Sequence, residues 1–279
     1  MPSLRALIDA GHTVSVVITR PDRRRGRGGQ LSASPVKVAA TALGLRVAHR
    51  IDEFDPTDVD RGIVVAYGAM IPAALLERVA MLNVHFSLLP RWRGAAPVER
   101  AILAGDEVTG VGIMSLEAEL DTGPIHLERR TDVGDKTAGA LTSELAQLGA
   151  GALVEVLGSP ALLEHPRAQE GEVTYAAKVT NETFHLVPSM SCELVLRTVR
   201  LERAFTLVQG RRLRVRRAHA LDTVDAPAGS LHAHEGVVTL VCEEGAVALD
   251  EVQPEGGRPM SGWAWWSGAR LHATNARWT

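Results

Sequence analysis

Asn83 and His85 are the two residues whose types and spacing best fit chemistry at one point of this sequence. They belong to an apolar run at 82–89 that predicts a β-strand, in which residues two apart face the same side. An amide and an imidazole that titrates near neutral pH would therefore point at one surface. Both lie near the carboxyl end of the strand, where open α/β sheets bind ligands. A histidine in a strand is also often structural, so the pair alone leaves both interpretations open.

A carboxylate follows in the segment LDTGPI, where Asp121 lies in a loop between strands predicted at 109–116 and 123–131. Asp-Thr-Gly is also the active-site triplet of aspartic proteases, but those need two such aspartates on a pseudo-symmetric β fold. This chain supplies one, on an α/β pattern. An ordinary turn explains the segment equally well, so Asp121 is a candidate catalytic carboxylate with a structural alternative.

The elements around these residues predict an α/β fold. Strands are expected at 14–19, 62–67, 82–89, 109–116 and 123–131, and helices at 2–10, 35–43, 71–79, 96–105 and from Leu141 to Val156. Because helices and strands alternate, we expect an open Rossmann-like sheet with right-handed crossovers.

The periodic pattern weakens after this domain. Residues 166–183 are polar and have no consistent period, which is typical of a linker, and the rest has short apolar runs separated by Gly, Pro and Asp. Such spacing is typical of a small OB-like β-barrel. The predicted domains are therefore 1–165 and 184–279, joined by a linker at 166–183.

Composition excludes several classes of protein. The chain has 279 residues, of which 46% are hydrophobic and 23% charged, as in globular proteins. No stretch approaches about 18 uninterrupted apolar residues, and the start, MPSLRALIDAGH, has charges where a secretory signal needs an apolar core. We expect a cytoplasmic monomer without a membrane span, with Cys192 and Cys242 as free thiols.

The net charge of −3 is unevenly distributed. Residues 20–37 carry six basic side chains and one acid, and residues 197–217 carry eight arginines and one acid, so the other 240 residues carry −15. Two basic islands on an acidic body would attract a polyanion locally. A solvated charged face is the alternative for each island.

Four blocks together resemble bacterial methionyl-tRNA formyltransferases. The blocks are RPDRRRGRGGQLSASPVK, VVAYGAMIP, NVHFSLLPRWRGAAPVERAILAGDEVTGV and LDTGPI, and the likeness continues through TYAAKVT, GRRLRV and EVQPEGGRPM. An Asn-x-His motif with a downstream Asp belongs to the wider folate-dependent formyltransferase superfamily. RWRGAAP and the arginine-rich loop point to the tRNA enzymes within it.

The resemblance implies transfer of a formyl group from 10-formyltetrahydrofolate to the α-amine of methionyl-initiator tRNA. Asn83, His85 and Asp121 match the catalytic positions. In these roles, Asn83 and a donor on His85 would stabilise negative charge on the formyl oxygen, while Asp121 would orient His85, favour its charged form and relay the proton. No metal is expected, because His232 and His234 have no third ligand near them.

The resemblance also implies two binding regions. The folate co-substrate would contact the turn Ser87, Leu88, Leu89 and Pro90, and a second turn with Tyr67 and Met70 would enclose its pteridine, with core packing as the alternative. The tRNA would contact Arg24, Arg25 and Arg27 in the glycine-containing loop, and Arg212, Arg214 and Arg216 on one strand face.

Two other functions remain open at this point. A formyltransferase acting on a nucleotide sugar or on glycinamide ribonucleotide would use the same chemistry, although such acceptors do not require a second basic domain. A catalytically weak RNA-binding remnant is the other alternative.

Family members begin with a strand and a glycine-containing loop ahead of the helix that corresponds here to 2–10. In a doubly wound sheet that strand lies between those predicted at 14–19 and 62–67, so we expect both edges to be unpaired. We expect the 279-residue chain alone to be poorly soluble or loosely folded, and restoring about 20–25 upstream residues to rescue folding and activity.

Overall fold

The structure is a computed structural model that describes residues 1–25, 30–57, 59–221, 224, 226–269, 271 and 276–279. It divides into two compact units. Unit 1 comprises 1–97, 108–132 and 142–176, and unit 2 comprises 98–107, 133–141 and 177–279. Two short segments predicted in the first domain thus group with unit 2, while the boundaries predicted at 165 and 184 stay predictions.

Unit 1 is built on a four-stranded sheet. Its strands, in spatial order, are β5 (Gly62–Val65), β6 (Met81–His85), β8 (Val108–Ser115) and β9 (Ile125–Asp132). β5 and β6 are parallel and the other two pairs are antiparallel, so the sheet is mixed. β6 is buried at every position because it has a strand on each side.

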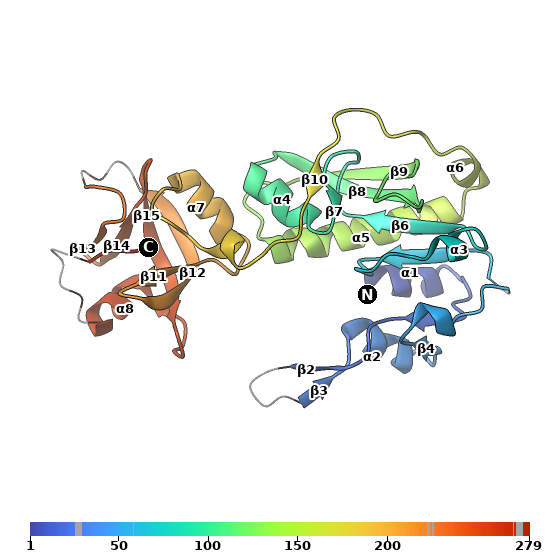
Figure 1. Ribbon diagram of the computed structural model, residues 1–279, viewed down its shortest axis with the longest axis horizontal. Coiled ribbons are helices and arrows are strands. Elements are labelled where there is room, and N and C mark those ends of the chain that lie inside the picture. Colours follow the sequence, from blue (N-terminus) through green and yellow to red (C-terminus); the bar gives the residue numbers. More distant parts are fainter. Residues whose placement is uncertain (26–29, 58, 222–223, 225, 270, 272–275) are drawn as a thin grey trace. The chain divides into compact units, whose positions relative to one another are not determined.

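Helix α5 (Ala138–Leu157) covers one face of this sheet (Figure 1). A Cβ at Gly149 would lie 2.7 Å from Val84 Cγ1 and 2.9 Å from Val111 Cγ2, so glycine lets the helix pack directly on β6 and β8. Of the described helices, α5 has the length and apolar composition to cross a membrane. Its packing on the sheet accounts for that composition.

The beginning of unit 1 is less complete than the sequence predicts. The run at 14–19 forms only β1 (Val17–Ile18), which pairs with β4 (Val47–Ala48) in a separate two-stranded sheet. In the described part of the chain, β1 has no partner besides β4, and β5 has none besides β6. The edges expected to be unpaired are therefore unpaired among the described strands, and the sheet is in two pieces because no described strand joins β1 to β5.

Shorter elements occur along the same part of the chain. They are α1 (Pro2–Asp9), β2 (Arg23–Arg25), β3 (Gln30–Ser32), α2 (Pro35–Ala42), η1 (Ile51–Glu53), α3 (Ala73–Leu76), β7 (Arg93–Gly94), α4 (Pro97–Ala104) and α6 (Pro160–Glu164). Among them, α4 groups with unit 2 from Val98 on. The predicted helices α1, α2 and α4 are confirmed, and α3 is shorter than the predicted 71–79. Ser34 caps α2 by accepting a hydrogen bond from Lys37 N at 3.2 Å.

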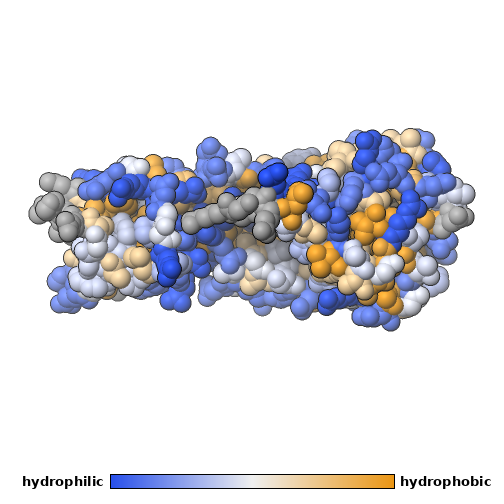
Figure 2. All heavy atoms as spheres, turned by 90° about the horizontal axis from the view of Figure 1, so that it is seen from below, coloured by the Kyte–Doolittle hydropathy of each residue, from blue (hydrophilic) through white to orange (hydrophobic). Residues whose placement is uncertain are grey.

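Apolar side chains are exposed around α2 and β3. Leu31 is 71% exposed, Val38 58% and Leu43 44%. Figure 2 shows orange apolar patches among hydrophilic residues on the face seen from below. β1 and β5 are only half-buried, in contrast to β6. This part of unit 1 has a thinner core than the sheet around β6.

The predicted linker has structure of its own. Within 166–183, β10 (Tyr175–Ala176) pairs with β7 in parallel, and η2 (Glu182–Phe184) follows. Arg167 also forms an antiparallel bridge with Ile125. The segment has no periodic pattern because its backbone bonds to loops rather than to a regular sheet.

Unit 2 contains a curled antiparallel sheet, and its helices include α7 (Cys192–Val199) and α8 (Gly262–Ala269). In spatial order its strands are β11 (Phe205–Val208), β12 (Arg211–Leu221), β15 (Ala246–Pro254), β14 (Val237–Val241) and β13 (Leu231–His234), with β16 (Met260–Ser261) on β15. A register shift after Val215 interrupts the pairing of β12 with β15.

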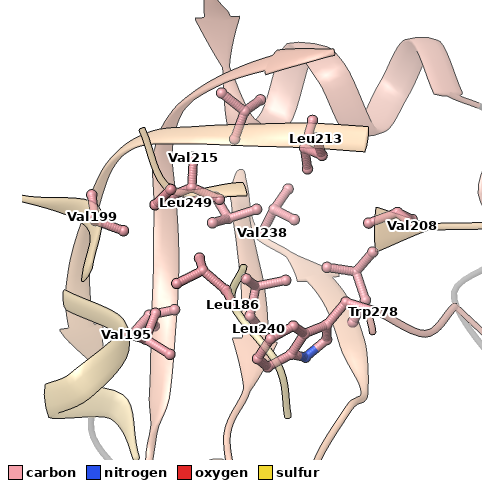
Figure 3. Close-up of a cluster of buried hydrophobic side chains, with 14 of the residues drawn as sticks. Leu186, Val195, Val199, Val208, Leu213, Val215, Val238, Leu240, Leu249 and Trp278 are labelled. Atoms are coloured by element: carbon pink, nitrogen blue, oxygen red, sulfur yellow. The ribbon is translucent and has the colours of Figure 1, made fainter. Parts of the chain in front are cut away.

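Residues 276–279 connect the two edges of this sheet. Leu207 and Thr279 exchange backbone hydrogen bonds of 2.9 Å, and Trp278 N donates to Gly229 O at 3.1 Å. Figure 3 shows the Trp278 ring among the apolar side chains inside the curled sheet. Trp278 is 1% exposed, and its Nε1 donates to Val241 O at 3.1 Å. The sheet therefore forms a small barrel-like core, as predicted for 184–279.

We predict that Trp278→Ala destabilises unit 2 by about 3–5 kcal/mol, because it removes a buried ring and leaves a cavity. Trp263→Ala is the matched control, since Trp263 is 42% exposed. Urea unfolding followed by tryptophan fluorescence and circular dichroism measures both. Equal stability of the two variants would contradict the structural role of Trp278.

Candidate functional site

The predicted residues Asn83 and His85 lie side by side on β6, and both are nearly buried. Asn83 is 9% exposed and His85, the last residue of the strand, is 5% exposed. Asp121 lies in the loop between β8 and β9 with a positive φ of 51°. A left-handed backbone is uncommon outside glycine, and Asp tolerates it better than most residues.

The Asp121 carboxylate faces both side chains of β6. Asn83 Nδ2 donates a long hydrogen bond of 3.5 Å to Asp121 Oδ1, and His85 Nδ1 lies 3.7 Å from Asp121 Oδ2. Gly94 N donates to the same Oδ2 at 2.8 Å. The structure therefore brings the three predicted residues together, and a turn alone does not account for a carboxylate aimed at His85.

The hydrogen bonding of His85 determines which nitrogen is free. Its Nε2 lies 3.0 Å from Trp92 O, and because a carbonyl only accepts, Nε2 carries the hydrogen and donates. Burial lowers the pKa of His85 and outweighs both the charge of Asp121 and the bond to Trp92, which raise it. Near neutral pH the ring is then neutral, with a lone pair on Nδ1.

This finding changes the role expected for His85. The sequence prediction used His85 as a donor in its charged form, but its N–H is already engaged by Trp92 and burial opposes the charge. Asp121 does favour the charged form, as expected, although burial prevails. The arrangement fits a base that accepts a proton at Nδ1 better than an oxyanion donor.

Residues that the sequence interpretation missed hold this group in place. Trp92 has a φ of 65°, and its N donates to Thr174 Oγ1 at 2.9 Å. A Cβ at Gly94 would lie 2.9 Å from Ala176 O, so the strand β7 needs glycine there to approach β10. These residues lie in the block RWRG and the segment TYAAKVT, which the sequence interpretation used only as part of a family resemblance.

The turn expected to contact folate is mostly core. Ser87 is fully buried and its Oγ donates to Arg91 O at 2.6 Å, while Leu89 packs with Met114 and Ile125. Pro90 is also buried, and Leu88 is half-buried. These side chains support the end of β6 from inside, and their contact with folate stays a prediction.

The second predicted folate turn is open to solvent. Met70 is 67% exposed and Tyr67 is half-buried, which excludes core packing for Met70. The turn follows β5, which is parallel to β6, so it lies at the same edge of the sheet as His85. Its position fits an apolar wall of a ligand site.

The predicted tRNA-contacting arginines differ in their surroundings. Arg24 is exposed on β2, Arg25 ends that strand, and Arg27 lies outside the described residues. On β12, Leu213 and Val215 are buried, as the predicted alternation requires.

The three β12 arginines have partners within the chain. The Arg212 guanidinium lies 3.6 Å from the Phe205 ring centroid, and Arg214 donates to Glu202 O. Arg216 Nε lies 2.9 Å from Glu251 Oε1. The residues described include no group of three His, Cys, Asp or Glu side chains arranged to hold a metal ion.

Two family descriptions match the chain. The family described as Formyl transferase matches residues 3–157, and the one described as Formyl transferase, C-terminal domain matches residues 189–270. Together they cover most of both units.

Solved structures share the fold at low identity. An N-formyltransferase from Helicobacter canadensis, in complex with folinic acid and dTDP-3-aminofucose, aligns with a TM-score of 0.65 at 13% identity, over 88% of this chain and 93% of that one. A methionyl-tRNA formyltransferase from Clostridium thermocellum aligns with a TM-score of 0.52 at 18% identity, over 75% and 94%. HypX from Aquifex aeolicus, in complex with tetrahydrofolic acid, aligns with a TM-score of 0.61 at 16% identity, over 90% and 46%.

Curated relatives are much closer in sequence. The methionyl-tRNA formyltransferase of Thiobacillus denitrificans is 39% identical over 97% of this chain and 94% of its own length. That of Novosphingobium aromaticivorans is 42% identical over 93% of this chain and 89% of its own length. Because the identity is this high over nearly the full length of both chains, the protein belongs to the methionyl-tRNA formyltransferase family.

Proposed function

We propose that this protein transfers a formyl group from 10-formyltetrahydrofolate to the α-amine of methionyl-initiator tRNA, in the cytoplasm and for translation initiation. The observation that carries the proposal is the buried group of Asn83, His85 and Asp121 at the end of β6. It occurs in a chain 39–42% identical to named methionyl-tRNA formyltransferases.

The residues of the site fit a folate co-substrate. Two structures with the same fold hold tetrahydrofolic acid or folinic acid. In this chain an amide, a neutral imidazole and a carboxylate converge at a sheet edge, and the exposed turn with Met70 follows the adjacent strand. An apolar wall beside convergent polar groups is the usual design of a small-molecule site.

The proposed mechanism assigns one task to each residue. When bound, 10-formyltetrahydrofolate supplies the formyl carbon that the amine attacks. His85 would accept the proton of the amine at Nδ1, and Asp121, 3.7 Å away, would stabilise the imidazolium that results. As the bond between the formyl carbon and the folate N10 breaks, the imidazolium would give that proton to N10, so that tetrahydrofolate leaves as the second product. Asn83 bonds Asp121 through Nδ2, which carries a second hydrogen able to stabilise negative charge on an oxygen.

Formylation of a sugar amine is the main enzymatic alternative. A solved sugar N-formyltransferase shares the fold, but at 14% identity this likeness extends to the fold alone. An assay with charged and uncharged initiator tRNA tests the proposal directly, since the formyl group should be transferred only to methionyl-tRNA. Transfer to a nucleotide sugar instead, or no transfer at all, would refute it.

We predict that His85→Ala and Asp121→Ala each lower formyl transfer by at least about a hundredfold with nearly unchanged tRNA binding, because both act at the reacting centre. Asn83→Asp should lose a comparable factor, since a second carboxylate repels developing negative charge. Single-turnover kinetics and filter binding measure the two effects. His165→Ala, an exposed histidine at the end of α6, is the control.

The pKa of His85 gives a second prediction. Burial lowers this pKa by more than the Asp121 charge raises it. NMR titration of the free protein should therefore place the pKa of His85 below the ordinary 6.5. Asp121→Asn removes the opposing charge and should lower the pKa further. A pKa above 6.5, or one that does not change in Asp121→Asn, would contradict the proposed pairing.

The basic loop gives a third prediction. Replacing Arg24, Arg25 and Arg27 with Ala should weaken tRNA binding, and each lost phosphate contact should lower the slope of log K against log salt by about 0.7–0.9. Arg78→Ala is the control, because Arg78 is an exposed arginine paired with Asp55. An unchanged slope would show that the loop is only a solvated turn.

A further inference from the structure

The segment 167–176 runs along the loops that carry the candidate catalytic residues. Arg167 and Ile125 exchange backbone hydrogen bonds of 2.7 and 2.9 Å. Thr174 accepts from Trp92 N, and β10 pairs with β7. A segment fixed at these places along the site is positioned to act on it, although none of its side chains belongs to the catalytic group.

Gln169 makes the most direct connection between this segment and the turn that carries Asp121. Its Nε2 donates to Asp121 O and to Gly123 O, both at 2.8 Å. Its Oε1 accepts from Arg93 Nε at 3.1 Å and from Arg93 Nη2 at 2.7 Å. Both hydrogens and both acceptor directions of the amide are used. The orientation of the amide is therefore fixed, since a flipped amide would place its oxygen against two carbonyls.

The turn to which Gln169 donates its hydrogen bonds has an uncommon backbone conformation. Asp121 has a positive φ of 51°, which a non-glycine residue adopts only when its surroundings impose it. Gly123 has no room for a side chain, because a Cβ would lie 2.0 Å from Ser115 O. Without bonds to the Asp121 and Gly123 carbonyls, the turn would be free to relax toward an ordinary conformation.

Arg93 and Gly94 are neighbours in β7 and connect Gln169 with the Asp121 carboxylate. Gly94 N donates to the carboxylate at 2.8 Å, while the neighbouring Arg93 holds Gln169, which holds the backbone of Asp121. The Arg93 charge polarises the Gln169 amide, and bonds in such a chain strengthen one another. The carboxylate of Asp121 is thus held by β7 directly, and its backbone is held by β7 through Gln169.

We propose that Gln169 is a positioning residue, which holds Asp121 against His85 by clamping the turn 121–123 to Arg93. The inference rests on the proposed function of the site. Asp121 Oδ2 lies 3.7 Å from His85 Nδ1, already longer than a hydrogen bond. A relaxed turn that moved the carboxylate further from Nδ1 would weaken the stabilisation of the His85 imidazolium.

The main test uses Gln169→Met, which keeps the length of the side chain and removes all four hydrogen bonds. We expect kcat to fall about ten- to a hundredfold, as for a misplacement of about 1 Å, with KM for tRNA changed less than about twofold. Gln147→Met is the matched control, because Gln147 is exposed on α5. A variant with unchanged kcat would overturn the proposal.

Two further measurements separate positioning from a merely structural role. Since Asp121 raises the pKa of His85, Gln169→Met should lower that pKa toward its value in Asp121→Asn. In the Asp121→Asn background, Gln169→Met should have little further effect on kcat, because the residue acts through Asp121. Additive losses in kcat, or an unchanged His85 pKa, would overturn the proposal.

Gln169→Glu provides a second variant if Gln169→Met does not fold cooperatively. It keeps acceptors for Arg93, loses the two donors to the turn and places an oxygen against the carbonyls of Asp121 and Gly123, so its kcat should fall by at least a similar factor. The NMR titration does not depend on the reaction. Wild-type protein that forms no formyl-methionyl-tRNA would refute the proposed function, whereas the His85 pKa in Gln169→Met would still decide whether the clamp exists.

Discussion

The site depends on placing the Asp121 carboxylate next to a neutral imidazole where both side chains are almost buried. The Asp121 side chain is 11% exposed and that of His85 is 6% exposed. A buried carboxylate is costly unless donors surround it, and here Gly94 N and Asn83 Nδ2 serve as donors. Burial at the same time lowers the pKa of His85, which leaves Nδ1 free as a base. One environment therefore holds the carboxylate in place and keeps the imidazole of His85 neutral.

This requirement explains why backbone segments approach so closely around the site. Gly94 tolerates Ala176 O at a distance that excludes a side chain, and Gly123 does the same with Ser115 O. Each approach places a backbone donor or a turn where the carboxylate needs it. The glycines of RWRG and LDTG thus follow from the same constraint as the candidate catalytic group.

The sequence predicted the three candidate side chains that the structure brings together better than the residues that hold them. Asn83 and His85 could be predicted because the two-residue period of a strand places them on one face. Asp121 could be predicted because it follows a strand-like run. Gln169 and Thr174 were missed because a polar segment without a period resembles a linker, and their partners lie about 50 to 80 positions away in the chain. The predicted strand length was wrong at 14–19, because an apolar run does not show how many of its residues pair with another strand.

The β12 arginines show a related limit of pattern analysis. Alternation correctly placed Leu213 and Val215 inside, but it could not show what the guanidinium groups contact. Arg214 is half-buried and bonded to Glu202 O, so presenting it to a phosphate would cost an internal contact. The Arg216 pair with Glu251 is partly exposed, and such pairs contribute little, so a phosphate can displace Glu251 at small cost. Arg211 and Arg217 are exposed on the same strand. Any polyanion bound by β12 would therefore meet Arg211, Arg216 and Arg217 more readily than Arg214.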